Sequence, residues 1–143
     1  MTEQDKQLLF KDLCARLPYH VRVKVWLEDG DTEEGPMDLQ HNYGDVLLDA
    51  FYYKKITKIK PYLRPLSSMT EEEKRELSKK YVWDINCGQI EIRYHSDGYW
   101  DDNIECPTSE YLNLFDWLSA HHFDYRGLIE KGLALEAPEE MYQ

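Results

Sequence analysis

The amino-acid sequence predicts an α+β domain: an N-terminal helix, a small curled antiparallel sheet, and C-terminal helices packed on that sheet. Two observations lead to this prediction. A helical start is followed, within about 60 residues, by short alternating segments separated by turn residues. Residues 108–143 then carry the densest set of apolar and aromatic side chains. We favour an SH3-like or Sm-like barrel as the form of the sheet.

The first helix is predicted from its capping residues. Thr2 and Asp5 have the spacing of a capping box, which begins a helix that continues to about Arg16. Pro18 ends it, because a proline disfavours the helical conformation of the residue before it. The buried face is expected to hold Phe10, Leu13, Cys14 and Leu17, with Cys14 as a small core residue.

The sheet is predicted from alternation. In residues 19–28, apolar residues at odd positions alternate with polar or aromatic ones at even positions, which is typical of a half-buried strand. Further strands are expected at 35–41, 45–53 and 55–60, with turns at 29–31 and 42–44. Pro61 is expected to end the last of these strands, because it cannot donate to the ladder.

The middle of the chain predicts a helix and a hairpin. Thr70 and Glu73 form a second capping box, for a mostly exposed helix over 71–80 whose large apolar residue is Leu77. Ion pairs are expected between Glu71 and Arg75 and between Glu76 and Lys80. Residues 89–94 alternate as a strand, and the turn at 96–98 predicts a hairpin with 99–100.

The C-terminal third predicts two helices. Thr108 or Ser109 caps the first, whose buried positions are Tyr111, Leu114, Phe115 and Leu118, with Trp117 buried against the sheet. Asp124 is expected to cap a short second helix over 125–131, which Gly132 ends. The acidic residues that follow Pro138 are expected to leave the core as a tail.

Length and charge bound the class of protein. A chain of 143 residues is expected to be a single domain, divided into 1–66, 67–107 and 108–143. The net charge is −11, and residues 67–143, with 17 acidic and 7 basic side chains, carry −10 of it. No membrane span or signal peptide is expected. Three cysteines, an odd number, favour a reduced, cytoplasmic setting, and no cofactor or metal is predicted.

Two stretches carry a resemblance to a family. The run DWLSAHHFDYRGLIEKGLALEAPEEMY and the run LRPLSSMTEEE at 63–73 resemble small proteins encoded in gut Bacteroidales genomes, often near prophage or other mobile-element genes. The signature residues are Trp117, His121, His122, Asp124, Tyr125, Arg126 and Gly127. The family has Glu-Gly-Met-Tyr where this chain has Glu139-Glu140-Met141-Tyr142. The resemblance implies a mobile-element context and supplies no mechanism.

Potentially chemical residues gather at 116–126. His121, His122, Asp116 and Asp124 suggest metal binding or acid–base catalysis, but adjacent histidines on a helix point about 100° apart and rarely share an ion. No HExxH or CxxC spacing is present. The competing interpretation is structural: one histidine holds the helix end, the other packs under Phe123, Asp124 caps, and Arg126 pairs with a carboxylate. The sequence leaves enzymatic activity undecided and favours its absence.

The segment 51–66 has the composition of a nucleic-acid-binding surface. Its candidate contact residues are Tyr53, Lys54, Lys55, Lys58, Lys60, Tyr62 and Arg64, and it contains no acid. The competing interpretations are a lysine edge that prevents sheet-to-sheet pairing, or a dock for the acidic half of the chain. Because residues 67–143 carry −10, we expect no oligonucleotide binding.

The predicted function is therefore a non-enzymatic protein-interaction or accessory factor of mobile-element origin. Carboxylates at 71–73, 101–102 and 139–140 would meet a basic protein partner, or would mimic DNA toward a DNA-binding protein. The alternative is a nucleic-acid-binding small β-barrel that uses 51–66.

Overall fold

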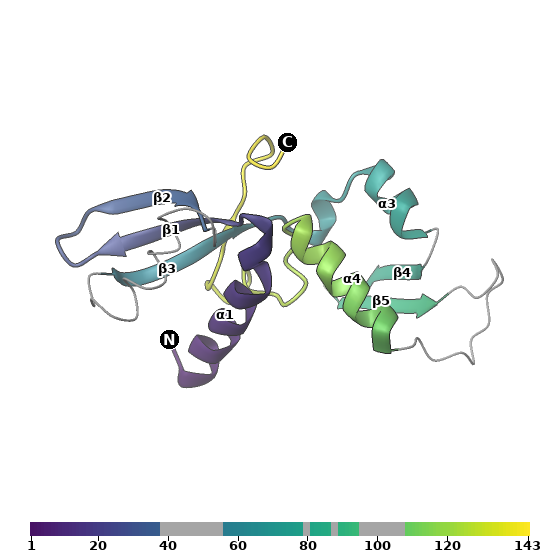
Figure 1. Ribbon diagram of the computed structural model, residues 1–143, viewed down its shortest axis with the longest axis horizontal. Helices are drawn as coiled ribbons and strands as arrows, with labels where there is room; N and C mark the ends of the chain where they lie inside the picture. The colour runs from purple at the N-terminus through teal and green to yellow at the C-terminus, as the bar shows by residue number, and fades with distance from the viewer. Residues whose placement is uncertain (38–55, 79–80, 87–88, 95–107) are drawn as a thin grey trace.

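The computed structural model describes residues 1–37, 56–78, 81–86, 89–94 and 108–143. The helices are α1 (Glu3–Arg16), α3 (Glu71–Ser78) and α4 (Thr108–Ala120), with short 3-10 turns at Leu17–Tyr19 and Leu66–Ser68. The strands are β1 (Arg22–Leu27), β2 (Thr32–Pro36), β3 (Ile56–Leu63), β4 (Tyr81–Asn86), β5 (Gln89–Tyr94) and β6 (Leu135–Glu136). Figure 1 shows the sheet that contains β1–β3 at one end of an elongated molecule, with α3 and the β4–β5 hairpin at the other. The α+β class is confirmed.

The main sheet is open and mixed. Its order is β2-β1-β3-β6, with β1 antiparallel to β2 and β3, and β6 parallel to β3. The expected barrel is therefore not closed among the described residues. The physical reason is β6, which is two residues long, arrives from the C-terminal segment and pairs only with Tyr62 and Leu63. Such a strand extends one edge of a sheet and cannot close it.

Strand β3 differs from its prediction because it continues through Pro61 to Leu63. The proline is tolerated because β6 pairs only beyond it. Thr57 is an extra residue opposite the step from Trp26 to Leu27, so the register shifts there. This bulge turns Ile56 toward the core, and the Thr57 hydroxyl donates to the Trp26 carbonyl at 3.1 Å.

Helix α1 begins at the predicted capping box but buries a different face. Thr2 and Asp5 exchange hydrogen bonds of 3.0 and 3.1 Å. The core between α1 and the sheet is built by Leu9, Leu13, Val21, Val23, Val25, Met37, Leu63, Leu128, Leu133 and Ala134. Cys14 is exposed and Phe10 is 50% exposed, so their predicted burial is wrong. The stripe is rotated because two charged side chains, Asp12 and Arg16, are buried as a pair.

A second core lies between α3 and α4. Its buried residues are Leu66, Met69, Leu77, Leu114, Leu118 and Phe123. Trp117 is only partly buried and packs on this cluster, not on the sheet as predicted. Its indole nitrogen donates to Glu76 at 3.2 Å, while Phe115 is 40% exposed. Leu114 and Leu118 are buried as predicted, the predicted burial of Phe115 is wrong, and the side chain of Tyr111 lies outside the described residues. Helix α4 packs against Leu77 of α3 in this cluster and also contacts α1.

Helix α3 has its predicted capping box, with Glu73 N donating to the Thr70 hydroxyl at 3.2 Å. Its ion pair differs from the prediction, because Glu71 pairs with Lys74 at 3.1 Å while Arg75 Nε donates to the Glu71 carbonyl. The following strands, β4 and β5, form their own antiparallel hairpin apart from the main sheet. The strand predicted at 89–94 is confirmed as β5, whereas its predicted partner at 99–100, the strand predicted at 45–53 and Lys80 lie outside the described residues. Strand β2 occupies 32–36, earlier than the strand predicted at 35–41.

The C-terminal segment forms turns where a second helix was predicted. The Asp124 carboxylate accepts from Leu128 N at 2.8 Å and from Ile129 N at 2.9 Å, so its capping role is confirmed while the helix is not. Gly127 and Gly132 both have φ +71, the left-handed conformation expected of Gly132. Among the described residues, no helix is long and apolar enough to cross a bilayer.

Candidate functional site

Arg64 joins two stretches, 63–73 and 117–143, that lie far apart in the sequence. It follows β3 directly, and its backbone N–H donates to the His122 carbonyl at 2.8 Å. The Asp124 N–H donates back to the Arg64 carbonyl at 2.8 Å, which makes a parallel bridge between Arg64 and Phe123. Residues 63–73 and 117–143, far apart in sequence, are therefore one packed unit.

The Arg64 side chain fixes the start of α3 in that unit. Its two terminal nitrogens donate to the Glu73 carboxylate at 2.9 and 2.7 Å, and its guanidinium lies 4.2 Å from the Phe123 ring centroid. Burial raises the pKa of Glu73, but hydrogen bonds from Arg64 and Thr70 outweigh it and lower the pKa to about 2. Glu73 is thus a fixed anion that is already paired.

A cleft of about 550 Å³ opens between α3 and the C-terminal tail. It is lined by residues of these same two stretches: Arg64, Pro65, Ser68, Thr70, Glu73, His121, Glu136, Ala137, Pro138, Glu139, Tyr142 and Gln143. We call it the α3–tail cleft. Glu136 and Glu139 are exposed in it, and neither has an ion-pair partner in the described part of the chain. The cleft therefore presents two uncompensated carboxylates beside a rigid Arg64–Glu73 pair.

The two histidines have structural partners. His121 Nδ1 lies 2.9 Å from the Trp117 carbonyl, and its ring stacks on the Trp117 ring at 3.9 Å. His122 has φ +64 and stacks on Tyr142 at 3.8 Å, not under Phe123 as predicted. Burial, together with the charge of Arg16, lowers the pKa of His122 to about 4. Within the described ranges, no three His, Cys, Asp or Glu side chains gather as metal ligands would.

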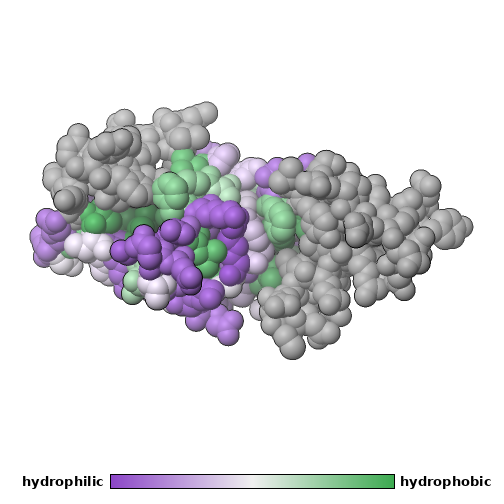
Figure 2. Space-filling model, turned by 90° about the horizontal axis from the view of Figure 1, so that it is seen from below, coloured by the Kyte–Doolittle hydropathy of each residue, from purple (hydrophilic) through white to green (hydrophobic). Residues whose placement is uncertain are grey.

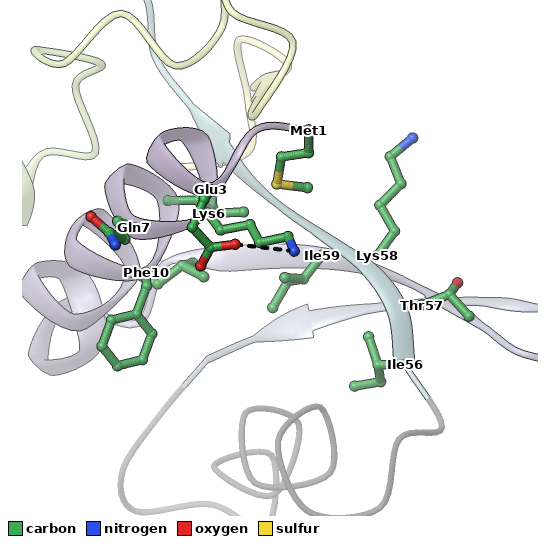
Figure 3. Close-up of a pocket in the computed structure, with 11 residues that line it drawn as sticks. Met1, Glu3, Lys6, Gln7, Phe10, Ile56, Thr57, Lys58 and Ile59 are labelled. Carbon is green, nitrogen blue, oxygen red and sulfur yellow. Dashed lines mark hydrogen bonds and ion pairs between the residues drawn. The ribbon is translucent and has the colours of Figure 1, made fainter.

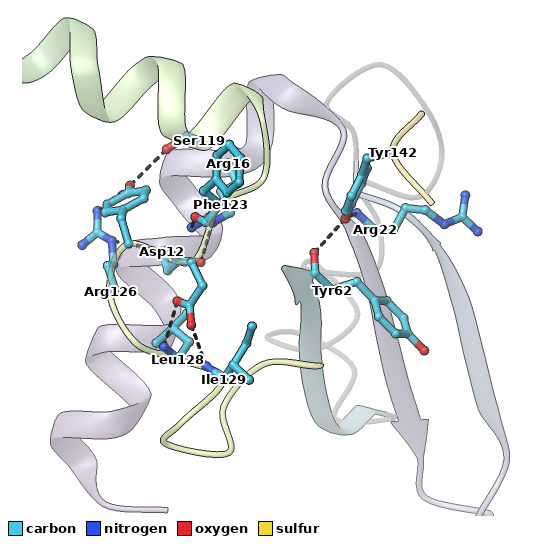
Figure 4. Close-up of polar contacts among 12 residues, drawn as sticks. Asp12, Arg16, Arg22, Tyr62, Ser119, Phe123, Arg126, Leu128, Ile129 and Tyr142 are labelled. Carbon is cyan, nitrogen blue, oxygen red and sulfur yellow. Dashed lines mark hydrogen bonds and ion pairs between the residues drawn. The ribbon is translucent and has the colours of Figure 1, made fainter. Parts of the chain in front are cut away.

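The tail returns to the sheet, in contrast to the prediction that it leaves the core. The Tyr142 hydroxyl accepts from Arg22 N at 3.0 Å and donates to the Tyr62 carbonyl at 2.8 Å, as Figure 4 shows. Burial raises the pKa of Tyr142 to about 12. This hydroxyl therefore bridges β1 and β3 and holds one wall of the α3–tail cleft in place.

A buried charge pair anchors the opposite side of the C-terminal segment (Figure 4). Arg16 and Asp12 are both fully buried and lie 2.7 Å apart, and Arg16 Nη2 donates to the Phe123 carbonyl at 2.7 Å. Arg126 Nε lies 3.3 Å from Asp12 Oδ1, which confirms a carboxylate partner for Arg126, although its N–H is not aligned for a hydrogen bond. The i, i+4 spacing of Asp12 and Arg16 was the available sequence signal.

Tyr125 lies within that buried network. Its ring is 5.2 Å from the Arg16 guanidinium and 5.0 Å from that of Arg126, and its hydroxyl lies 3.0 Å from Ser119 Oγ. Of the signature residues, Asp124, Tyr125 and Arg126 are thus engaged with other parts of the chain. Their arrangement positions the C-terminal segment on α1.

The residues predicted to bind nucleic acid are divided. Tyr53, Lys54 and Lys55 lie outside the described residues. Lys58, Lys60 and Tyr62 share the face of β3 that points away from α1, whereas Arg64 is separate from them and paired with Glu73. The same sheet face also carries Arg22, Lys24 and Trp26 of β1, which were not candidates. Their alternation in the predicted strand was the signal that could have identified them.

An apolar cleft of about 480 Å³ lies between α1 and β3 (Figure 3). Leu9, Leu13 and Ile59 contribute to its lining, and Glu3 and Lys6 pair at its rim at 3.5 Å. Figure 2, a view of the molecule from below, shows hydrophilic residues (purple) on the surface with hydrophobic residues (green) beside them. Its polar lining residues are Glu3, Lys6, Gln7, Thr57 and Lys58, and Glu3 and Lys6 already pair with each other, so we regard it as the weaker candidate site.

A scan against family models finds no match to this chain, and searches of the curated proteins and of the solved structures find none either.

Proposed function

We propose that the protein is a non-enzymatic protein-interaction factor that binds a basic segment of a partner protein in the α3–tail cleft. The observation that carries this proposal is the pair of exposed carboxylates, Glu136 and Glu139, which line a cleft of about 550 Å³ without a cationic partner among the described residues. Lysine or arginine side chains of a partner would supply the missing charge.

The surroundings of the cleft support a basic partner. Glu71 and Glu72 at the start of α3 are exposed on one side, and Glu140 is exposed on the other. Residues 67–143 carry a net charge of −10, which steers a cationic segment toward this half of the molecule. The walls are held by the Arg64–Glu73 pair and by Tyr142, so little order has to be created on binding.

The groups nearest the cleft favour binding over catalysis. His121 is held by the Trp117 carbonyl and ring, and His122 is stacked on Tyr142. Among the described residues, neither has a carboxylate within hydrogen-bond distance that would orient it as a general base. The resemblance to mobile-element proteins adds the expectation of an accessory role in such an element.

The test compares two double variants that remove equal charge. Glu136→Gln with Glu139→Gln changes the cleft, and Glu28→Gln with Glu33→Gln changes exposed carboxylates on the β1–β2 hairpin. Immobilised protein is exposed to lysate of the native host, and binding of a labelled arginine-rich peptide is measured in parallel. We expect a stoichiometric basic protein that the wild type and the hairpin variant retain and the cleft variant loses.

Two results would oppose the proposal. One is recovery of no stoichiometric partner at any salt concentration. The other is equal loss of partner and peptide in both double variants, which would show that net charge and not the cleft controls binding.

A further inference from the structure

The outer face of the main sheet gathers basic and aromatic side chains from two strands. Lys24 of β1 lies opposite Lys60 of β3, and Trp26 lies opposite Lys58. Residues two apart in a strand point to the same side, so Arg22 and Tyr62 belong to this face as well. Val23 and Val25, on the alternate positions of β1, are buried on the opposite face against α1.

The charges on this face do not balance. Glu34 of β2 pairs with Lys24 at 3.3 Å and accepts from the Tyr62 hydroxyl at 2.7 Å. Arg22, Lys58 and Lys60 have no ion pair with any described residue. Burial, and then the neighbouring charge of Lys58, lower the pKa of Lys60. The positive charges of Lys58 and Lys60 therefore lie side by side on this face, although the chain as a whole is acidic. A bound anion would reduce the repulsion between these two side chains.

Trp26 lies among these cations. The Lys58 ammonium is 4.7 Å and the Lys24 ammonium 5.5 Å from the centroid of its ring. The indole is half-buried, so part of its surface is accessible on this face. The face therefore combines an aromatic platform with lysines that can move from the ring to an incoming phosphate.

We propose that the outer face of β1 and β3 binds single-stranded nucleic acid, with Arg22, Lys24, Lys58 and Lys60 contacting phosphates and Trp26 stacking on a base. Cations two residues apart on a strand are separated by about 6.6–6.8 Å, comparable to successive phosphates of an extended single strand. Because the aromatic platform needs an unstacked base, a single strand fits better than a duplex.

The described part of the acidic half reaches β1 and β3 at one end of the sheet, where β6 pairs with Tyr62 and Leu63 and the Tyr142 hydroxyl bonds to the backbones of Arg22 and Tyr62. Figure 1 shows β1–β3 at one end of the molecule and α3 with the β4–β5 hairpin at the other. Repulsion between separated charges decays over a Debye length of about 10 Å at 0.1 M salt. Lys24, Trp26 and Lys58 lie farther along the strands, without a contact to the acidic half among the described residues. On this geometry we propose oligonucleotide binding where the charge balance of the sequence alone predicts none.

The experiment is fluorescence anisotropy of a labelled oligothymidylate of about 12 nucleotides, within the usual range of site sizes, titrated at several salt concentrations. Four phosphate contacts predict a slope of log affinity against log salt of about −2.8. Lys58→Glu is expected to reduce that slope by about 0.7 and to weaken binding. Lys11→Glu, an equal charge change at an exposed position of α1, is the control and should leave the slope unchanged.

Stacking is tested separately, with Trp26→Leu and thermal melting of each variant. Loss of one base contact is expected to weaken binding by roughly 5- to 140-fold. Absence of binding at about 50 mM salt, an equal effect of Lys11→Glu, or tighter binding of a duplex of the same length would overturn the proposal. So would polyglutamate that binds as tightly as the oligonucleotide, because that result would indicate an acidic polypeptide as the ligand.

Discussion

Replacement of Arg16 by methionine is predicted to be one of the most damaging single changes in the first helix. The side chain is fully buried, 2.7 Å from the Asp12 carboxylate, and it also donates to the Phe123 carbonyl at 2.7 Å. Methionine fills much of the same space but supplies no charge and no donor. The variant would leave Asp12 as a buried anion with Arg126 Nε, 3.3 Å away, as its nearest cation.

The size of the effect follows from that geometry. Removing one partner of a buried ion pair costs about 3–5 kcal/mol, because the other charge stays out of water. Arg126 compensates in part, so we expect the lower end of that range, near 3 kcal/mol. If the buried charge is the cause, the double variant Asp12→Leu with Arg16→Met should be at least about 1 kcal/mol more stable than Arg16→Met alone.

Urea unfolding followed by far-UV circular dichroism measures these differences as shifts of the midpoint at constant m-value. Lys11→Met, at an exposed position one turn away, is the matched control and should change stability by less than about 0.5 kcal/mol. A cost below about 1 kcal/mol for Arg16→Met would refute the reasoning. A double variant less stable than the single would show that the hydrogen bonds, and not the isolated charge, dominate.

Three further predictions concern the C-terminal segment. The His122 pKa of about 4 lies below its unfolded value near 6.5, so the unfolded chain binds more protons between them. The contribution of His122 to the free energy of unfolding is therefore fully present above about pH 6.5 and is lost as the pH falls through about 4. A melting temperature that is unchanged between pH 7 and 5 would contradict this. His122→Asn should make the melting temperature depend less on pH. Gly127→Ala, at φ +71, should cost about 1–2 kcal/mol, whereas Gly35→Ala, with an ordinary φ and open space, should be near neutral in the same unfolding assay. Trp117→Ala should cost about 2 kcal/mol in urea unfolding, less than the 3–5 of a fully buried aromatic, because the indole is only partly buried.

Local elements could be predicted because their causes are local. The capping boxes at Thr2 and Thr70 need only a partner three residues away, and both are present. The alternation that predicts β1 reflects burial of one face, which any sheet packed on α1 would require. The αL conformation at Gly132 likewise follows from the residue itself.

Only some of the residues that form the candidate surfaces could be predicted from the sequence. The lysines of β3 and the tail carboxylates stand out by composition. Their neighbours do not, because Arg22, Lys24 and Trp26 join the basic face only through the register of β1 on β3. Arg64 was predicted to be part of the basic surface. In the fold its side chain instead pairs with Glu73 of α3, whose carboxylate accepts hydrogen bonds from both terminal nitrogens of Arg64.

The sequence by itself determined the α+β class, the capping residues and the alternating strand, since these depend on neighbours within a few positions. Tertiary structure decided the burial of Asp12 and Arg16, the parallel pairing of β6 that leaves the sheet open, and the return of Tyr142 to β1 and β3. Each of these depends on a contact between distant segments. The stabilisation that these contacts provide comes from desolvation and hydrogen bonding between segments far apart in the sequence. Local propensity does not specify which segments meet.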